Sequence, residues 1–171
     1  MKDAPALVMA IVYWLHMLAT VTWIGGLVTL AGIVLPAARR TLDGAAYSAF
    51  LGRVQERLQQ VGWMSLLVLG GTGMFQMSAN RNYNGFMAID NPWAQAILAK
   101  HVVILVMVGV SAYSTWGLMP ALRRNAMLRA AGRTVSEADG KRLARQESLL
   151  LGLNLGFSVL VLALTAWAWI S

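Results

Sequence analysis

The sequence contains no cysteine, and ionisable side chains are scarce: 12% of its 171 residues are charged and seven are acidic. The absence of cysteine excludes a disulfide scaffold. Soluble domains carry roughly 25% charged residues, so a chain with half that share cannot cover a globule of this size with polar surface. These shortages exclude a soluble enzyme, a coiled coil and a disordered tail.

Long apolar runs are what the sequence has instead. Four stretches contain no Lys, Arg, Asp or Glu: 4–38, 58–80, 101–122 and 148–171. Each exceeds the length of about 20 residues that a helix needs to cross a bilayer. The sequence therefore predicts a single domain over 1–171, an all-α integral membrane bundle of four helices in up-down-up-down order, with spans at about 5–35, 58–78, 93–119 and 148–170.

Prolines and polar stretches set the expected ends of these spans. The first span is expected to end near Leu35-Pro36 and the third at Pro120, since proline interrupts helices. Apolar residues at helical spacing from Ala45 onward predict an amphipathic helix that runs into the second span. A capping-box-like segment that begins at Ser136 predicts another helix, which continues into the fourth span.

The basic residues are unevenly distributed along the chain, which has a net charge of +7. Eleven of the fourteen lie in the connections 36–57 and 120–147. This asymmetry is the positive-inside pattern of a multi-pass protein of the bacterial inner (plasma) membrane. It predicts that these two connections are cytoplasmic and that connection 79–92 and both termini are extracytoplasmic. The partner of the basic residues is then the lipid bilayer and not a nucleic acid.

His16 and His101 are the two histidines, and both fall within predicted spans. An ionisable residue inside a span is costly and indicates a function. Each lies about five residues outward from the centre of its span, which is roughly 7–8 Å at 1.5 Å per residue. The first and third spans are diagonal in an up-down bundle, so two imidazoles at one depth could ligate one metal. Haem iron is a common partner of such histidines.

Further residues are expected around this pair, at the same depth or at the outer mouth. Glycines of the second span, near the matching depth at residue 74, would leave room for a flat macrocycle. A tryptophan on the His16 face of the first span could pack on a porphyrin edge, and cations at the outer mouth could bind propionates. The residues in these places are Thr20, Trp23, Gly70, Gly71, Gly73, Arg81 and Lys100.

Methionine supports a second metal hypothesis, because thioether and imidazole ligands suit Cu(I). Met74 and Met77 lie three residues apart on one face of the second span, close to the outer mouth. Methionine is also ordinary packing material in apolar helices. The two histidines, in turn, could simply form hydrogen bonds with a neighbouring backbone group or with a Ser or Thr side chain.

The fourth span carries a GxxxG element from Gly152 to Gly156, which could form a homodimer face or pack within the protomer. All seven acidic residues lie outside the spans or at their ends. Proton pumping through a buried carboxylate is therefore not expected.

Two patches of sequence resemble a known family. The segment from Tyr13 to Leu27, YWLHMLATVTWIGGL, resembles the His-x6-Trp-x-Gly-Gly signature of the copper-resistance D (CopD) family of membrane proteins. The segment from Leu98 to His101 resembles the start of the corresponding helix in that family. The resemblance implies a membrane protein linked to copper uptake or tolerance, with His16 as a site residue. The first span is also similar to that of HemJ-type protoporphyrinogen oxidases, which bind haem.

Together these features predict a membrane b-type haem protein, with haem b held by His16 and His101 near the outer face in a homodimer. It would transfer electrons between membrane quinol and an extracytoplasmic redox partner. The alternative is a copper-handling or copper-transport protein that uses His and Met ligands.

Overall fold

The computed structural model describes residues 5–42, 44–85 and 90–170. The described chain is helical except for short connections, in agreement with the predicted all-α class. Two π turns join helices end to end, so that the helices form four long rods. The elements are α1 (Ala6–Thr29), a π turn (Leu30–Val34), α2 (Leu35–Thr41), α3 (Gly44–Ala79), α4 (Pro92–Tyr113), a second π turn (Ser114–Leu118), α5 (Met119–Ala130) and α6 (Glu137–Ile170).

Both prolines at which a span was expected to end lie inside a continuous helical rod, so the expectation that they end their helices is wrong. A proline has no N–H to donate, and its ring clashes with the carbonyl four residues back. A wider π turn precedes each one: the Leu35 N–H bonds to the carbonyl five residues back, and Met119 N–H does the same. The extra residue in each π turn accommodates the proline ring and its missing N–H without ending the helix. The rods therefore continue to Thr41 and Ala130.

The other predicted helix ends are close to those observed. The amphipathic helix and the second span form one continuous α3, and the helix after Ser136 continues through the fourth span as α6. The α4 helix begins at Pro92, and the Asn91 side-chain oxygen accepts a hydrogen bond from the Ala94 N–H at 2.7 Å. This is an ordinary N-terminal cap.

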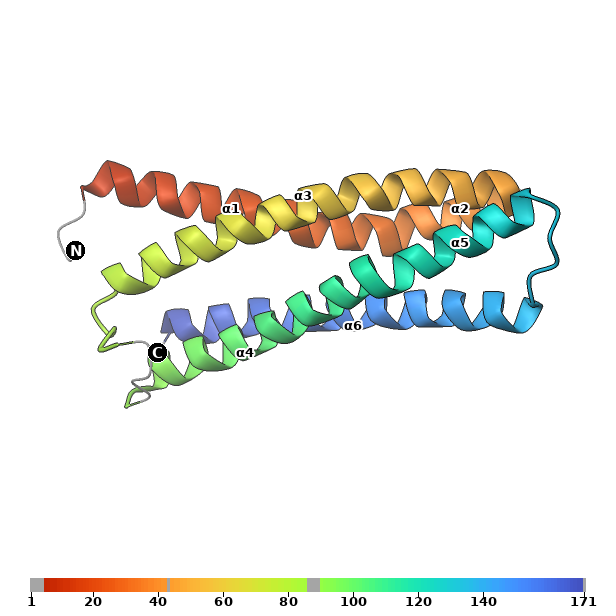
Figure 1. Cartoon of the computed structure of the whole chain (residues 1–171). Coiled ribbons are helices and arrows are strands. Elements are labelled where there is room, and N and C mark those ends of the chain that lie inside the picture. The colour runs from red at the N-terminus through yellow and green to blue at the C-terminus, as the bar shows by residue number, and fades with distance from the viewer. Residues whose placement is uncertain (1–4, 43, 86–89, 171) are drawn as a thin grey trace.

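The four rods run in alternating directions (Figure 1). The start of α1, the end of α6 and the α3–α4 connection lie at one end of the bundle, called the terminal end below. The α2–α3 and α5–α6 connections lie at the opposite end, called the basic end. The main packed pairs are α1 with α3 and α4 with α6, and contacts of α1 with α6 and of α3 with α5 join them. The α1 rod is therefore diagonal to α4, as predicted.

Aromatic and small side chains hold the two pairs together. At the terminal end, Trp93 and Ala168 are buried in one cluster, and Met77 of α3 packs against it. Nearer the middle, the rings of Trp63 and Trp116 stack with centroids 5.3 Å apart. These contacts connect the α3 helix with the α4–α6 pair.

The outer surface of the bundle is apolar. Leu67 is 72% exposed, Leu105 69% and Trp169 84%, a distribution that requires lipid rather than water around the helices. Within the described residues, three rods are long and apolar enough to cross a membrane: Ala6–Thr41, Pro92–Arg129 and Glu137–Ile170. The protein is therefore a multi-pass membrane protein. Crossing by α3, which contains several glycines and polar residues, stays a prediction.

Candidate functional site

His16 lies on α1 and faces α3. Its Nδ1 atom lies 2.8 Å from Thr72 Oγ1. A Cβ atom added to Gly73 would lie 3.5 Å from His16 Cε1. The sequence placed residue 74 at the depth of His16, and the observed register agrees within two residues. The imidazole ring therefore packs against α3 at Gly73, where a methyl group would fit in ordinary contact and a larger side chain would not.

The hydrogen bonds around Thr72 define the tautomer of His16. The Thr72 hydroxyl lies 2.6 Å from the Val68 carbonyl oxygen. A carbonyl can only accept, so the single hydroxyl proton points to Val68. Thr72 Oγ1 then accepts from the His16 Nδ1–H, and the lone pair of the imidazole is on Nε2.

His101 has the same tautomer for a different reason. Its Nδ1 lies 2.7 Å from the carbonyl oxygen of Ile97, one turn earlier on α4. Because this oxygen can only accept, Nδ1 must carry a proton, and in the neutral imidazole the lone pair is then on Nε2. Metal-ligating histidines usually donate their second ring N–H to an oxygen in this way. In the neutral form of both rings, Nδ1 carries the proton and Nε2 has the lone pair.

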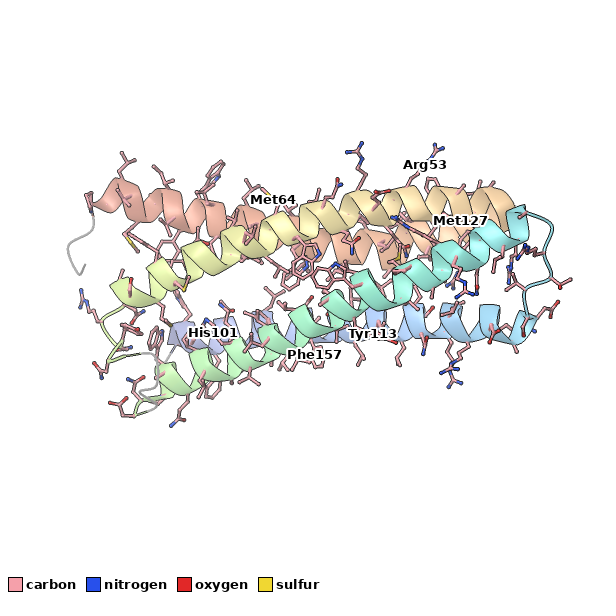
Figure 2. The ribbon with its side chains drawn as sticks, in the orientation of Figure 1. Arg53, Met64, His101, Tyr113, Met127 and Phe157 are labelled. Carbon is pink, nitrogen blue, oxygen red and sulfur yellow. The ribbon has the colours of Figure 1, made fainter. Side chains whose placement is uncertain are left out.

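The two histidines lie in the same half of the bundle, on diagonal helices. Figure 2 labels His101 toward the terminal end, with Arg53 and Met127 toward the basic end. Lys100, next to His101, is close enough to His16 to act on it electrostatically. Among the described residues, no group of three or more His, Cys, Asp or Glu could hold a metal.

The other predicted cofactor-binding residues are more dispersed. The Thr20 hydroxyl donates to the His16 carbonyl at 2.8 Å. Trp23 is buried against Gly62 of α3, further along the bundle, and lines a central cavity. The positions of Gly70 and Gly71 face open space.

The predicted residues nearer the outer mouth are also apart from one another. Arg81 is exposed, whereas Lys100 is half-buried. Met74 is 60% exposed on the outer surface, whereas Met77 packs inward against the Trp93 cluster. The structure therefore does not bring the two thioethers together.

The GxxxG element of α6 faces outward. Gly152 and Gly156 are exposed, and a Cβ atom at either would meet nothing within 4 Å. The alternative that the element packs within the protomer is therefore wrong. Its role as a contact between two copies of the chain stays a prediction.

A central cavity, lined mostly by apolar side chains and by a few polar ones, was missed by sequence reasoning. Its volume is about 170 Å³, and Glu147 and Asn154 of α6 line it. Glu147 is only 9% exposed and accepts a hydrogen bond from Gln55. Sequence reasoning placed this acid at a span end, but the structure places it inside the bundle. The spacing of Glu147, Asn154 and Ser158 on one helical face was the available signal.

These features define a multi-pass α-helical membrane protein with two intramembrane imidazoles in the same half of the bundle, each hydrogen-bonded through Nδ1. A family model for copper resistance protein D, CopD, matches residues 52–168. The match covers more than half of the chain, and the chain belongs to this family. The matched segment includes His101 and two of the residues that line the cavity, Glu147 and Asn154. His16 on α1 precedes this segment. Comparison with curated proteins and with solved structures gives no match.

Proposed function

We propose that this protein handles copper at the membrane and that His16 and His101 ligate Cu(I) as cargo. The observation that supports this most is the shared tautomer: each ring donates Nδ1–H to an oxygen and keeps its lone pair on Nε2. Imidazole is a good copper ligand, and such hydrogen bonds orient it. Membership of the copper resistance protein D family supports copper as the metal.

The charge near the pair favours transient binding. The Lys100 ammonium acts electrostatically on His16, and a positive neighbour weakens the binding of another cation. Among the described residues, no carboxylate cluster compensates for it. A site of this kind suits a protein that passes copper on rather than one that stores it.

Haem b is a second candidate for the same two histidines, because histidine is a common ligand of haem iron. His16 and His101 would hold the iron, and Lys100 and Arg81 would lie toward the propionates. Bound haem would supply one-electron transfer, with membrane quinol and an extracytoplasmic redox partner as donor and acceptor. Both proposals place the histidine pair near the extracytoplasmic face of a bacterial inner membrane and use the outward GxxxG face for a homodimer.

Metal content and visible spectrum test the proposal. The full chain purified in detergent is expected to bind one Cu(I) under reducing conditions, measured by elemental analysis and competition with a Cu(I) chelator. His16→Ala and His101→Ala are each expected to lose this binding, whereas Met17→Ala, exposed on α1, retains it. Unchanged copper affinity in both histidine variants would exclude these ligands. Sharp reduced α and β bands after expression in haem-replete cells would assign the pair to haem instead.

Thr72→Val tests the hydrogen bond that orients His16. Valine keeps the shape of threonine but removes the oxygen that accepts the Nδ1–H. We expect the affinity for Cu(I) to fall about 10–100-fold, the usual effect of losing such a partner. Thr22→Val is the matched control, because the Thr22 hydroxyl is exposed and bonds only to its own helix. Equal affinity in the two variants would show that Thr72 does not orient a ligand.

A further inference from the structure

A shallow, open groove at the basic end combines arginine side chains with apolar ones. It lies along α5 and the turn that follows this helix. Its lining consists of Arg123, Arg124 and Arg133 together with the apolar residues Pro120, Met127, Leu128 and Ala131. Among the described residues that line it, none is acidic. Met127 lies toward the basic end, whereas His101 lies toward the terminal end (Figure 2), so the groove is separate from the histidine pair.

The end of α5 turns the chain back so that Arg133 lies beside the helix. The Gly132 N–H bonds to the Arg129 carbonyl, and the Arg133 N–H bonds to the Leu128 carbonyl, each at 3.0 Å. This pair of bonds is a Schellman C-cap, which requires a left-handed residue before the last donor. Gly132 supplies it with a φ of 69°. Arg133 is thereby held against the last turn of α5 and lines the same groove as Arg124.

The protein neutralises only part of the positive charge in the groove. Arg123 pairs with Glu56 of α3 at 3.5 Å. Within the part of the chain that the structure describes, the Arg124 and Arg133 side chains form neither an ion pair nor a hydrogen bond. Guanidinium groups bind phosphate oxygens through paired, charge-assisted hydrogen bonds. The groove therefore offers two guanidinium groups to a phosphate.

The groove begins where the third rod leaves its apolar segment. The charge-free run 101–122 ends directly before Arg123. Trp116 precedes the groove on the same rod and is 69% exposed, and exposed tryptophan is typical of a membrane–water interface. Met127 is 70% exposed although it lies between arginines. A free anion would leave this side chain in water, whereas the glycerol and acyl chains of a lipid would cover it.

We propose that this groove binds one anionic phospholipid from the membrane leaflet that the basic end faces. The Arg124 and Arg133 guanidinium groups bind its phosphate, and Pro120 and Met127 pack against its glycerol and acyl chains. Basic residues at a membrane surface attract anionic lipids in general, and basic pockets beside membrane helices bind individual headgroups. The apolar residues between the arginines make this groove such a pocket. The site contains neither histidine, so it does not depend on the metal that they bind.

Thermal unfolding of the delipidated full chain in detergent tests this site. The probe is dioleoylphosphatidylglycerol, and the reference is dioleoylphosphatidylcholine, which has the same acyl chains and no net charge. Saturating phosphatidylglycerol is expected to raise Tm by about 5 °C relative to the reference, since a ligand that binds only the folded state stabilises it. Inorganic phosphate at the same concentration should leave Tm unchanged. Equal Tm in the two lipids, or an equal shift with phosphate, would overturn the proposal.

Two double variants separate the groove from the general charge of the basic end. Arg124→Gln/Arg133→Gln removes both phosphate-binding groups and should reduce the phosphatidylglycerol shift to less than half. Arg53→Gln/Arg57→Gln is the matched control, because it removes the same charge from exposed side chains of α3 that do not line the groove. Figure 2 labels Arg53 toward the basic end. The control should keep nearly the whole shift, and equal losses in the two variants would contradict a defined site.

Met127→Ser tests whether a lipid, and not only its charge, occupies the groove. The substitution keeps both guanidinium groups but removes the exposed apolar side chain between them. We expect the affinity for phosphatidylglycerol, obtained from Tm as a function of lipid concentration, to fall about fivefold, because less apolar surface is then covered. Unchanged affinity in this variant would show that Met127 is not covered by lipid and would contradict the proposed packing.

Discussion

Gly73→Leu is expected to abolish Cu(I) binding while Gly70→Leu leaves it unchanged. A Cβ atom at Gly73 already lies 3.5 Å from His16 Cε1, which is ordinary contact. The additional carbons of leucine have no room there and must push the imidazole away from Thr72. We expect the affinity for Cu(I) to fall by about 100-fold or more. Overpacking of the α1–α3 pair should also lower the free energy of unfolding by about 1–3 kcal/mol.

The Gly70→Leu variant separates the clash with His16 from the general effect of replacing a glycine of α3 by leucine. Gly70 is one turn away on the same helix and has nothing within 4 Å of a Cβ atom. Both variants gain the same helix propensity, about 1 kcal/mol relative to glycine, so the difference between them reports the clash alone. Gly73→Ala, in ordinary contact with the ring, should bind copper almost normally. If Gly73→Leu binds copper as tightly as Gly70→Leu, His16 is not a ligand.

The depth of His16 relative to α3 could be predicted because it depends only on counting residues along helices. The rise per residue placed His16 opposite residue 74 of the second span, and the observed contacts are at Thr72 and Gly73. The tautomer of His16 could not be predicted in this way. It depends on a threonine hydroxyl of another helix whose proton is committed to its own backbone. The partner of the His16 ring is therefore known only once α1 is packed against α3.

Helix ends and Glu147 show two other limits of the sequence. Proline predicted helix ends at Pro36 and Pro120, but the backbone widened into π turns, which side-chain patterns do not reveal. Glu147 was assigned to a connection because a charge-free run begins at the next residue. Its burial depends on Gln55 of α3, which satisfies the carboxylate from another helix. Most charged side chains have no polar partner inside the bundle and therefore lie outside the membrane. For this reason charge patterns usually predict membrane spans well.

Trp23→Ala is expected to cause a large loss of stability, about 3 kcal/mol in the free energy of unfolding. Trp23 is 9% exposed, and its indole lies 3.8 Å from a Cβ position on Gly62 of α3. Removing a buried tryptophan leaves a cavity and typically costs 3–5 kcal/mol. The lower end applies here, because the unfolded helices remain in an apolar medium and the transfer contribution is smaller.

The matched control for Trp23→Ala is Trp14→Ala, on the same helix but 62% exposed. This variant loses lipid-facing surface and no internal contact, so it should change the free energy by no more than about 0.5 kcal/mol. Titration of the detergent-solubilised chain with sodium dodecyl sulfate, followed by circular dichroism, measures both variants. Equal effects would mean that the fit of Trp23 against Gly62 does not hold α1 to α3. Trp23→Phe keeps one ring and should lose less free energy of unfolding than Trp23→Ala. Such an intermediate loss would show that the volume filled between α1 and α3 stabilises the pair.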